Sequence, residues 1–178
     1  MKPGGGKRKG NGYEIIISKI LSKWYVKNFI PRRYRDKKER NTDFFWRTAG
    51  SGAKSTINRS SQTSFTGDIT FLPTPDRLKI WIDCKDVKTT TFDNILSGKF
   101  LPERWHKEEV EKMDALGMEK PVVIIFKLYR RKENYILFST ADFEYMFTRS
   151  DNLVRMLKYH VMLFEDFLYC VPKEDILE

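Results

Sequence analysis

Two short apolar stretches and the turn between them place the strongest constraint on how this chain folds. Residues 67–86 read GDITFLPTPDRLKIWIDCKD, which predicts two strands joined by a Pro-containing turn as an antiparallel hairpin over 68–85. Charged residues are poor strand formers. Here, however, Asp68 begins the first strand, and Asp83 and Lys85 end the second. The fold must therefore accommodate these charges together at one end of the hairpin.

The alternation of side chains along the second strand decides which of these groups meet. Successive side chains of a strand point to opposite faces. Asp83 and Lys85 therefore share one face, whereas Cys84 points the other way, into the core. The predicted hairpin pairing brings Asp68 beside them. Two carboxylates about 4 Å apart repel each other by about 4 kcal/mol at an effective dielectric constant of 20, and a divalent cation removes this repulsion.

A Mg²⁺ ion suits such a pair of carboxylates, because it prefers hard oxygen ligands and leaves positions for water and phosphate oxygens. A bound metal ion lowers the pKa of a water molecule and neutralises charge that builds up on a phosphate. Lys85 is placed to hold the attacking water or the developing charge. These three residues predict phosphodiester hydrolysis; an ordinary surface hairpin with a salt bridge is the alternative.

Positive charge is concentrated in the first part of the chain. Residues 1–66 contain 16 Lys and Arg against 4 Asp and Glu, a net charge of +12, whereas residues 67–178 contain 17 against 20, a net charge of −3. This one-sided distribution predicts a polyanionic partner, nucleic acid before an anionic membrane; a basic surface that only aids solubility is the alternative. The cations expected to contact DNA are Lys7, Arg8, Lys9, Arg32, Arg33, Arg35, Lys37, Lys38, Arg40, Lys54 and Arg59.

The length of 178 residues predicts a single domain. Composition predicts a flexible basic arm over 1–11, a core over about 12–140 and a helical extension over about 141–178. The chain has no predicted membrane span or signal peptide, so we expect an intracellular protein without a membrane partner. Periodicity predicts a mixed sheet flanked by helices, with helices over 12–30, 103–116, 139–147 and 150–171 and further strands over 43–50, 121–129 and 134–139.

Two residues outside the hairpin are further candidates for a site. Glu14 lies on the helix face shared by Ile17, Leu21 and Tyr25, and a charge on an apolar face needs a partner, which a metal site would supply. The alternative is an acid in the first helical turn, stabilised by the helix dipole. Arg47 precedes a Gly-rich turn, TAGSG, whose backbone can approach a phosphate, although such turns are common.

Taken together, Glu14, Arg47 before AGSG, GD at 67–68 and DCK at 83–85 resemble the PD-(D/E)xK nuclease superfamily. Their order and spacing are most similar to those of the archaeal-type Holliday junction resolvases. The resemblance covers roughly residues 7–90. It implies an α/β fold of the restriction-endonuclease type, in which helices flank a mixed central β-sheet.

The resemblance also implies an activity and its residues. It implies a single nuclease domain over 12–178 that acts as a two-fold homodimer on branched DNA, with Mg²⁺ as the cofactor and Mn²⁺ as a substitute. A two-fold dimer suits a four-way junction, where two symmetric strands are cut in pairs. The implied site residues are the metal ligands Asp68, Asp83 and Glu14, the catalytic lysine Lys85, and Arg47 and Ser51 at the scissile phosphate.

The chain departs from the resolvase pattern at several positions. Asp83 stands where this family more often has Glu, Gly67 rather than Pro precedes Asp68, and Cys84 is larger than the usual small aliphatic residue. These departures leave the substrate open. A nuclease of the same fold that acts on duplex DNA or DNA ends is one alternative, and a non-catalytic nucleic-acid-binding module is another.

Two insertions and the C-terminal part exceed a minimal resolvase. The insertions span 31–42 and 53–66, and the second either orders on DNA near the site or has no role. The Met- and aromatic-rich stretch over 156–169 is either core or a dimer interface formed by Leu157, Met162, Phe164 and Phe167. Small resolvases of this type occur in archaea and phages, so we expect a protein of the cytoplasm or nucleoid, including the host cytoplasm for a phage protein.

Overall fold

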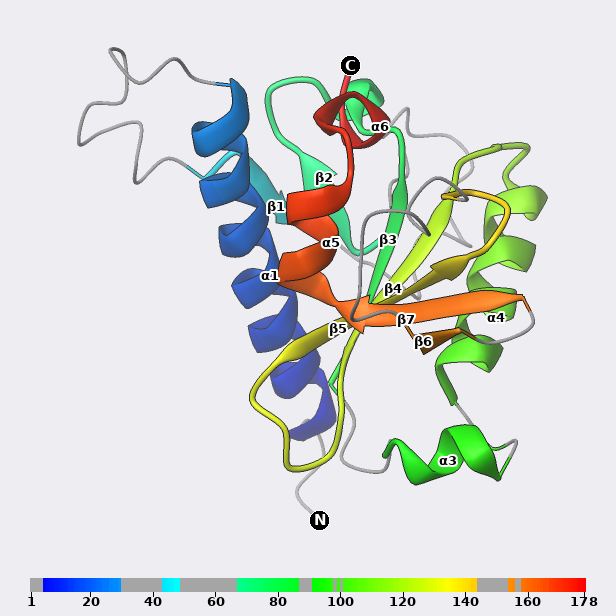
Figure 1. The fold of residues 1–178 in the computed structure, drawn as a ribbon. Helices are drawn as coiled ribbons and strands as arrows, with labels where there is room; N and C mark the ends of the chain where they lie inside the picture. Colours follow the sequence, from blue (N-terminus) through cyan, green and yellow to red (C-terminus); the bar gives the residue numbers. More distant parts are fainter. Residues whose placement is uncertain are drawn as a thin grey trace.

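The computed structural model describes residues 5–29, 43–48, 67–86, 91–97, 99, 101–143, 154–155 and 158–178 (Figure 1). None of the helices in these ranges is both long and apolar enough to cross a membrane. The elements, in chain order, are α1 (Gly5–Phe29), β1 (Phe45–Arg47), β2 (Ile69–Phe71), a 3₁₀ turn η2 (Pro75–Arg77), β3 (Trp81–Lys85), α3 (Asp93–Leu96), α4 (Leu101–Ala115), β4 (Val122–Lys127), β5 (Asn134–Ser139), β6 (Val154–Arg155), β7 (Tyr159–Leu163), α5 (Phe164–Cys170) and α6 (Lys173–Ile176).

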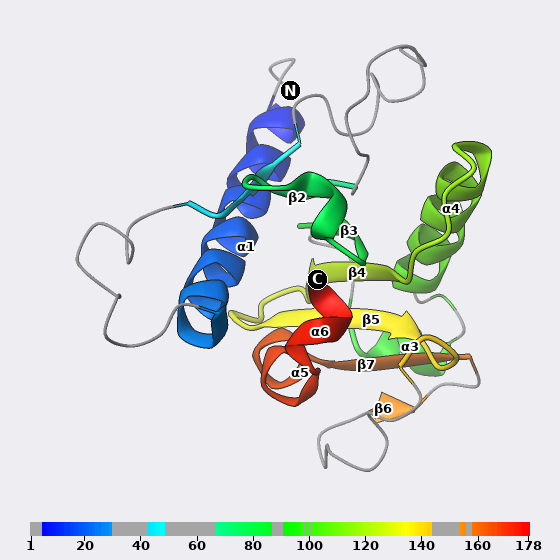
Figure 2. The ribbon, with the colours of Figure 1, turned by 90° about the horizontal axis from the view of Figure 1, so that it is seen from above.

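The centre of the fold is a mixed five-stranded sheet with the order β3-β4-β5-β7-β6. β3 and β4 run parallel, with Trp81 opposite Val122 and Lys85 opposite Phe126, and the remaining neighbours are antiparallel. Helices cover both faces of the sheet, with α1 and α4 on opposite sides (Figure 2). The predicted α/β architecture, a mixed sheet flanked by helices, is therefore confirmed.

Two separate hydrophobic clusters fill the two faces of the sheet. Val123 and Ile125 of β4 belong to the cluster formed with α1 and α5, whereas Ile124 and Phe126 belong to the cluster formed with α4. Because both faces are covered, every position of β4 from Val122 to Phe126 is apolar and buried. The strand thus has the continuous apolar sequence of a buried parallel strand rather than an alternating one.

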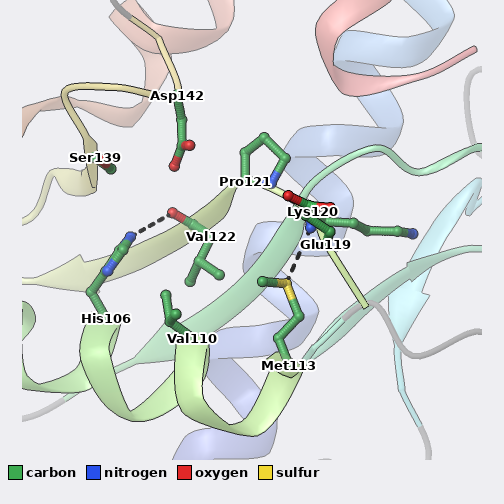
Figure 3. A pocket seen from close by; sticks show the side chains of 9 residues that line it. All are labelled: His106, Val110, Met113, Glu119, Lys120, Pro121, Val122, Ser139 and Asp142. Atoms are coloured by element: carbon green, nitrogen blue, oxygen red, sulfur yellow. Dashed lines mark hydrogen bonds between the residues drawn. The ribbon is translucent and has the colours of Figure 1, made fainter. Parts of the chain in front are cut away.

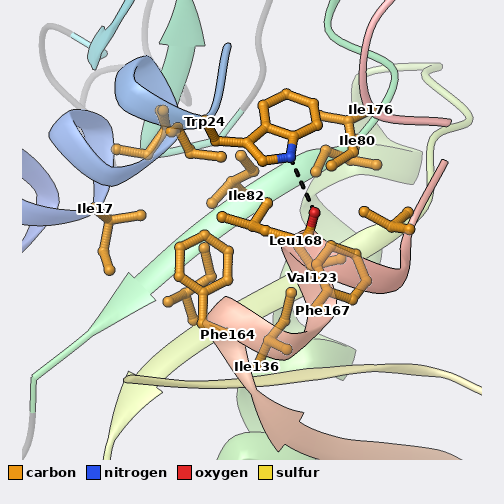
Figure 4. Close-up of a cluster of buried hydrophobic side chains, with 14 of the residues drawn as sticks. Ile17, Trp24, Ile80, Ile82, Val123, Ile136, Phe164, Phe167, Leu168 and Ile176 are labelled. Carbon is orange, nitrogen blue, oxygen red and sulfur yellow. Dashed lines mark hydrogen bonds between the residues drawn. The ribbon is translucent and has the colours of Figure 1, made fainter. Parts of the chain in front are cut away.

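The larger cluster joins α1 to the C-terminal part of the chain (Figure 4). The indole Nε1–H of Trp24 donates a hydrogen bond to the backbone oxygen of Leu168 at 3.0 Å. Ile17 of α1 and Phe167 of α5 are completely buried in the same cluster. This packing fixes α1 against the sheet face that also holds Ile82.

Residues of the C-terminal part also fix the segment that leads into β3. Leu78 and Leu177 form an antiparallel bridge. The backbone N–H of Lys79 donates to the oxygen of Ile176 at 3.0 Å, and that of Glu178 donates to the oxygen of Arg77 at 3.1 Å. Residues 77–79, which lead into β3, are therefore held in place by residues 176–178, about 100 positions later in the chain.

A second, two-stranded sheet lies against α1. β1 and β2 pair antiparallel, with Phe45 opposite Phe71 and Arg47 opposite Ile69. The hydroxyl of Ser22, on α1, accepts the backbone N–H groups of Phe44 and Phe45 at 3.0 and 2.9 Å. These bonds hold β1 on α1, and so place Arg47 near the N-terminal half of that helix.

The predicted hairpin over 68–85 is wrong. β2 pairs with β1, and β3 pairs with β4, so the two strands are not antiparallel partners. Between them, Gly67 and Ile82 form an isolated parallel bridge. The physical reason is the length of the connection. Residues 72–80 include the 3₁₀ turn η2 and are too long for a tight hairpin turn.

The predicted helix over 150–171 is also wrong in most of its described part. Residues 159–163 form β7, which pairs with β5, and only Phe164–Cys170 is helical. His160, Val161 and Met162 are all buried, because both faces of β7 are covered, and this hides the two-residue period. Met162, Phe164 and Phe167 therefore belong to the core rather than to a dimer interface. Leu157 lies outside the described residues.

The other predicted helices agree more closely with the structure. α4 and the strands β1, β4 and β5 lie where they were predicted. α1 ends at Phe29, before Pro31, as predicted, but it begins at Gly5, so it includes residues 5–11 that were assigned to a flexible arm. Residues 140–143 form a turn rather than the start of a helix, and the rest of the predicted helix over 139–147 lies outside the described residues.

Candidate active site

The end of β3 carries a close pair of opposite charges. The Lys85 ammonium donates a hydrogen bond to Oδ1 of Asp83 at 2.6 Å. Asp83 is buried, whereas 29% of the Lys85 side chain is exposed. Cys84, between them, is buried in the cluster on the opposite face. The predicted division of the strand into two faces is confirmed.

Asp68 reaches the same strand by backbone contacts. Its N–H donates to the oxygen of Ile82 at 2.6 Å, and its Oδ2 accepts the N–H of Cys84 at 2.9 Å. Asp68 thus lies beside Asp83, as predicted, although it does so through a parallel bridge rather than a hairpin. Gly67, which precedes it, has a φ of +79°. Pro cannot adopt that angle, which explains why Gly stands before Asp68.

Burial and the neighbouring charges shift the pKa values of both Asp83 and Lys85. Burial raises the pKa of the Asp83 carboxyl well above its usual range, and the charge of Asp68 raises it further, while Lys85 opposes both effects. Burial lowers the pKa of Lys85, but the neighbouring Asp83 and the hydrogen bond to it outweigh this and leave the pKa raised. Lys85 is therefore a cation rather than a base. It can hold negative charge on a substrate.

Glu14 and Arg47 form the second charged pair of the site. Arg47 Nε lies 3.3 Å from Glu14 Oε2, and the Glu14 side chain is 9% exposed. Burial raises the pKa of Glu14, and Asp68 raises it further, whereas Arg47 and Lys85 lower it. The partner that Glu14 needs on its apolar helix face is thus Arg47. Glu14 therefore lies close enough to Asp68 and Lys85 for their charges to shift its pKa, and Arg47 lies beside Glu14.

The ion pair leads to a prediction about stability. Arg47→Gln is expected to lower the free energy of unfolding by about 2 kcal/mol, because it leaves the buried Glu14 carboxylate without its cation. The matched control is Arg104→Gln, which breaks the exposed ion pair of Arg104 with Glu108 and should cost less than about 0.5 kcal/mol. Urea unfolding near pH 7 measures both. Equal losses would show that Glu14 does not depend on Arg47.

The donor set fits a hard divalent cation. Oδ2 of Asp83 is buried and has no hydrogen-bond partner among the described residues, and Asp68 lies next to it. Mg²⁺ is commonly held by one or two carboxylates, with water and phosphate oxygens as its other ligands. No three Asp, Glu, His or Cys side chains in the described ranges form a metal-binding group by themselves. Direct ligation by Glu14 as a third acid therefore stays a prediction.

The remaining predicted residues are only partly described. Lys7, Arg8 and Lys9 lie in the first turns of α1. Ser51 and the predicted DNA-binding cations Arg32, Arg33, Arg35, Lys37, Lys38, Arg40, Lys54 and Arg59 lie outside the described residues. The structure thus brings together Glu14, Arg47, Asp68, Asp83 and Lys85.

Glu109 of α4 is a further acid near the site that was not predicted from the sequence. It is 5% exposed, accepts the Trp81 indole N–H at 3.0 Å and pairs with Lys112. Its charge raises the pKa of Asp83. The signal was present in the sequence, because Glu109 lies one helical turn from two buried apolar residues, Trp105 and Met113. Glu14 was predicted as a site residue from the same signal, a charged side chain on an apolar helix face.

A separate pocket lies beside α4 at the start of β4 (Figure 3). His106 Nε2 is 3.1 Å from the oxygen of Val122, and the carboxylate of Asp142 lies across the pocket from α4. Burial lowers the pKa of His106. None of the predicted site residues lines this pocket. It is therefore distinct from the charged site at the end of β3.

One comparison with known proteins identifies a family for this chain. A family model described as "Phage putative PDDEXK endonuclease" matches residues 5–177, almost the whole chain. No curated protein and no solved structure matches the chain. The match confirms the resemblance at the level of the PD-(D/E)xK superfamily, though it does not extend to the archaeal resolvases, and it agrees with the mixed α/β sheet seen here. The chain belongs to the phage PDDEXK endonuclease family, whose fold is restriction-endonuclease-like.

Proposed function

We propose that the protein is a Mg²⁺-dependent DNA endonuclease that prefers branched DNA, four-way junctions above all. The observation that carries the catalytic part is the end of β3. There, a buried Asp83 with an unsatisfied oxygen (counted over the described residues) lies beside Asp68 and a protonated Lys85. A buried carboxylate that is repelled by its neighbour costs stability unless a cation joins it. Such an arrangement is expected where a metal ion and a phosphate meet.

The residues divide the work of hydrolysis. Asp68 and Asp83 would hold the metal ion, with Glu14 as a further acidic ligand, directly or through water. When bound, Mg²⁺ polarises a phosphate and lowers the pKa of a water molecule, and Mn²⁺ can supply the same chemistry. The backbone N–H of Cys84 orients the Asp68 carboxylate. Lys85 donates to the negative charge that develops on the phosphate.

Two of the remaining predicted residues would act at the phosphate. Arg47, paired with Glu14, presents a second cation near the site, and Ser51 follows it in the Gly-rich segment. The preference for branched DNA is supported by the similarity in motif order to junction resolvases and by the strongly basic first 66 residues, which suit backbone contacts without sequence reading. A homodimer would let two such sites cut symmetric strands in pairs.

The test is cleavage of a labelled four-way junction beside a linear duplex with the same arms. The wild type and Asp83→Asn are compared with Mg²⁺, with Mn²⁺ and with EDTA. Metal-dependent paired nicks in the junction alone, absent from Asp83→Asn, are the expected result. Equal cutting of both substrates would replace junction preference with a duplex nuclease. Binding of both substrates without cutting would overturn the proposed catalysis in favour of a binding module.

A further inference from the structure

The turn between β4 and β5 lies at the same end of the sheet as the candidate active site. β3 and β4 are parallel, with Lys85 opposite Phe126, so both strands leave the sheet in the same direction. Arg130 follows Phe126 by four residues, which is at most about 13 Å along the chain at the rise of a strand. In Figure 1, this turn lies in the lower part of the view, where β3 also ends.

A second contact ties this end of β4 to the site. The ammonium of Lys127, the last residue of β4, lies 5.6 Å from the centre of the Tyr13 ring. Tyr13 precedes Glu14 on α1. The end of β4 therefore lies next to the helical turn that carries the Glu14–Arg47 ion pair.

The turn carries a dense positive charge in a region that is otherwise slightly acidic. Arg130, Arg131 and Lys132 are consecutive and exposed, and no other run of three Lys or Arg occurs after residue 66. Residues 67–178 as a whole have a net charge of −3. Because residues 67–178 carry a net negative charge, the three cations of the turn form a local positive patch that can attract a polyanion.

Arg130 has a strained backbone conformation, and its side chain lies over the ring of Tyr129. The N–H of Arg131 donates to the oxygen of Leu128 at 3.0 Å, which makes Tyr129 and Arg130 the two central residues. Arg130 has a φ of 61°, a value that Gly or Asn normally supplies at the second central position, and no other non-glycine residue in the described ranges has a positive φ. Its guanidinium carbon lies 5.0 Å from the centre of the Tyr129 ring.

We propose that the turn over 129–132 binds the DNA strand that flanks the scissile phosphate. Arg131 and Lys132 contact backbone phosphates, and the Arg130–Tyr129 pair offers cation and ring together. Tyr129 is 43% exposed, and an exposed aromatic ring among cations is the combination that binds unstacked nucleotides. At 3.4 Å per nucleotide along a strand, the turn would reach phosphates within about four nucleotides of the cut. This inference rests on the proposed nuclease function.

The test is the salt dependence of DNA binding, measured by fluorescence anisotropy in EDTA so that no DNA is cut. The variant is Arg131→Gln with Lys132→Gln, which removes the two proposed phosphate contacts. The control is Lys158→Gln with Lys173→Gln, which also removes two exposed cations but at the opposite end of the sheet, because Lys158 adjoins the end of β5 and α6 adjoins the approach to β3. The turn variant should lower the slope of log K against log salt by about 2, one for each lost phosphate contact, and the control should not change it.

The outcomes separate this proposal from the nuclease function. Cleavage of DNA by the wild type, together with an unchanged slope in the turn variant, would overturn the proposal and leave the nuclease function in place. An equal loss of slope in the control would also overturn it, since the effect would then be net charge. A wild type that neither binds nor cuts DNA would overturn both. Because the substituted side chains are exposed, equal thermal melting of all the proteins is expected and is checked first.

Discussion

Asp83→Asn is expected to reduce the rate of DNA cleavage by about a thousandfold while leaving the metal-free protein at least as stable as the wild type. The loss of activity follows from the loss of a metal ligand. Charge stabilisation by a bound metal ion is worth several kcal/mol, and each 1.36 kcal/mol is a factor of ten in rate. The gain or neutrality in stability follows from the raised pKa of the buried Asp83 carboxyl, whose charge is unfavourable in the folded state.

The dependence of stability on pH has a defined sign. A carboxyl with a raised pKa binds more protons in the folded than in the unfolded state, so stability falls as pH rises above the ordinary Asp value of 3.8. Asn lacks this contribution. In EDTA, the free energy of unfolding of Asp83→Asn relative to the wild type should therefore increase as pH rises from about 4. Urea unfolding at a series of pH values measures this difference.

Metal binding gives a readout independent of cleavage. Added Mg²⁺ should raise the melting temperature of the wild type, because an ion that binds only the folded state stabilises it, and should have little effect on Asp83→Asn. Asp114→Asn, which changes an exposed carboxylate on α4, is the matched control and should behave as the wild type. If Asp83→Asn were clearly destabilised in EDTA, or still responded fully to Mg²⁺, Asp83 would be a structural residue rather than a ligand.

Gly67→Ala is expected to cost about 1–3 kcal/mol more in stability than Gly117→Ala, because overpacking adds to a strain that both share. Gly67 and Gly117 have φ values of +79° and +68°, so Ala meets the same backbone penalty at each. A Cβ at Gly67 would also lie 2.8 Å from the carbonyl carbon of Ile82 and closer still to its oxygen, whereas nothing lies within 4 Å of a Cβ at Gly117. The two variants thus separate the clash from the strain.

The clash also reaches the site. Asp68 is held by its N–H bond to Ile82 and by the N–H of Cys84, and moving the Gly67 backbone away from Ile82 displaces both contacts. Gly67→Ala should therefore cut DNA more slowly even below its melting temperature, and Gly117→Ala should cut as the wild type. Urea unfolding and single-turnover cleavage measure the two effects. Equal behaviour of the variants would show that the close approach of Gly67 to β3 is unimportant.

The sequence predicted the faces of β3 correctly but not its neighbours. The alternation over 80–85 is a local property, so it placed Asp83 and Lys85 on one face and Cys84 in the core. Strand pairing is not local. The parallel partner of β3 is β4, which follows only after α4, and nothing in the sequence near the PTPDR turn indicates it. Asp68 does lie beside Asp83 as predicted, but a parallel bridge between Gly67 and Ile82 places it there instead of a hairpin.

The errors at β7 and at Glu109 have different causes. His160, Val161 and Met162 are buried in succession, and a run of buried side chains shows neither the period of a strand nor that of a helix, so 150–171 was read as helical. Glu109 was missed although it carries the same signal as Glu14, an acid on an apolar helix face. Glu14 was predicted as a site residue because it also fits the motif order, whereas Glu109 belongs to no motif.

The bridge between Leu78 and Leu177 has a consequence for the order in which the protein can be assembled during synthesis. The strand that carries Asp83 is guided by contacts with residues 176–178, about 100 positions further along the chain, and contacts of such high sequence separation form late. A ribosome-bound chain that has not yet released α6 lacks the support for the approach to β3. The candidate site at the end of β3 therefore gains its full support only after residues 176–178 have been synthesised.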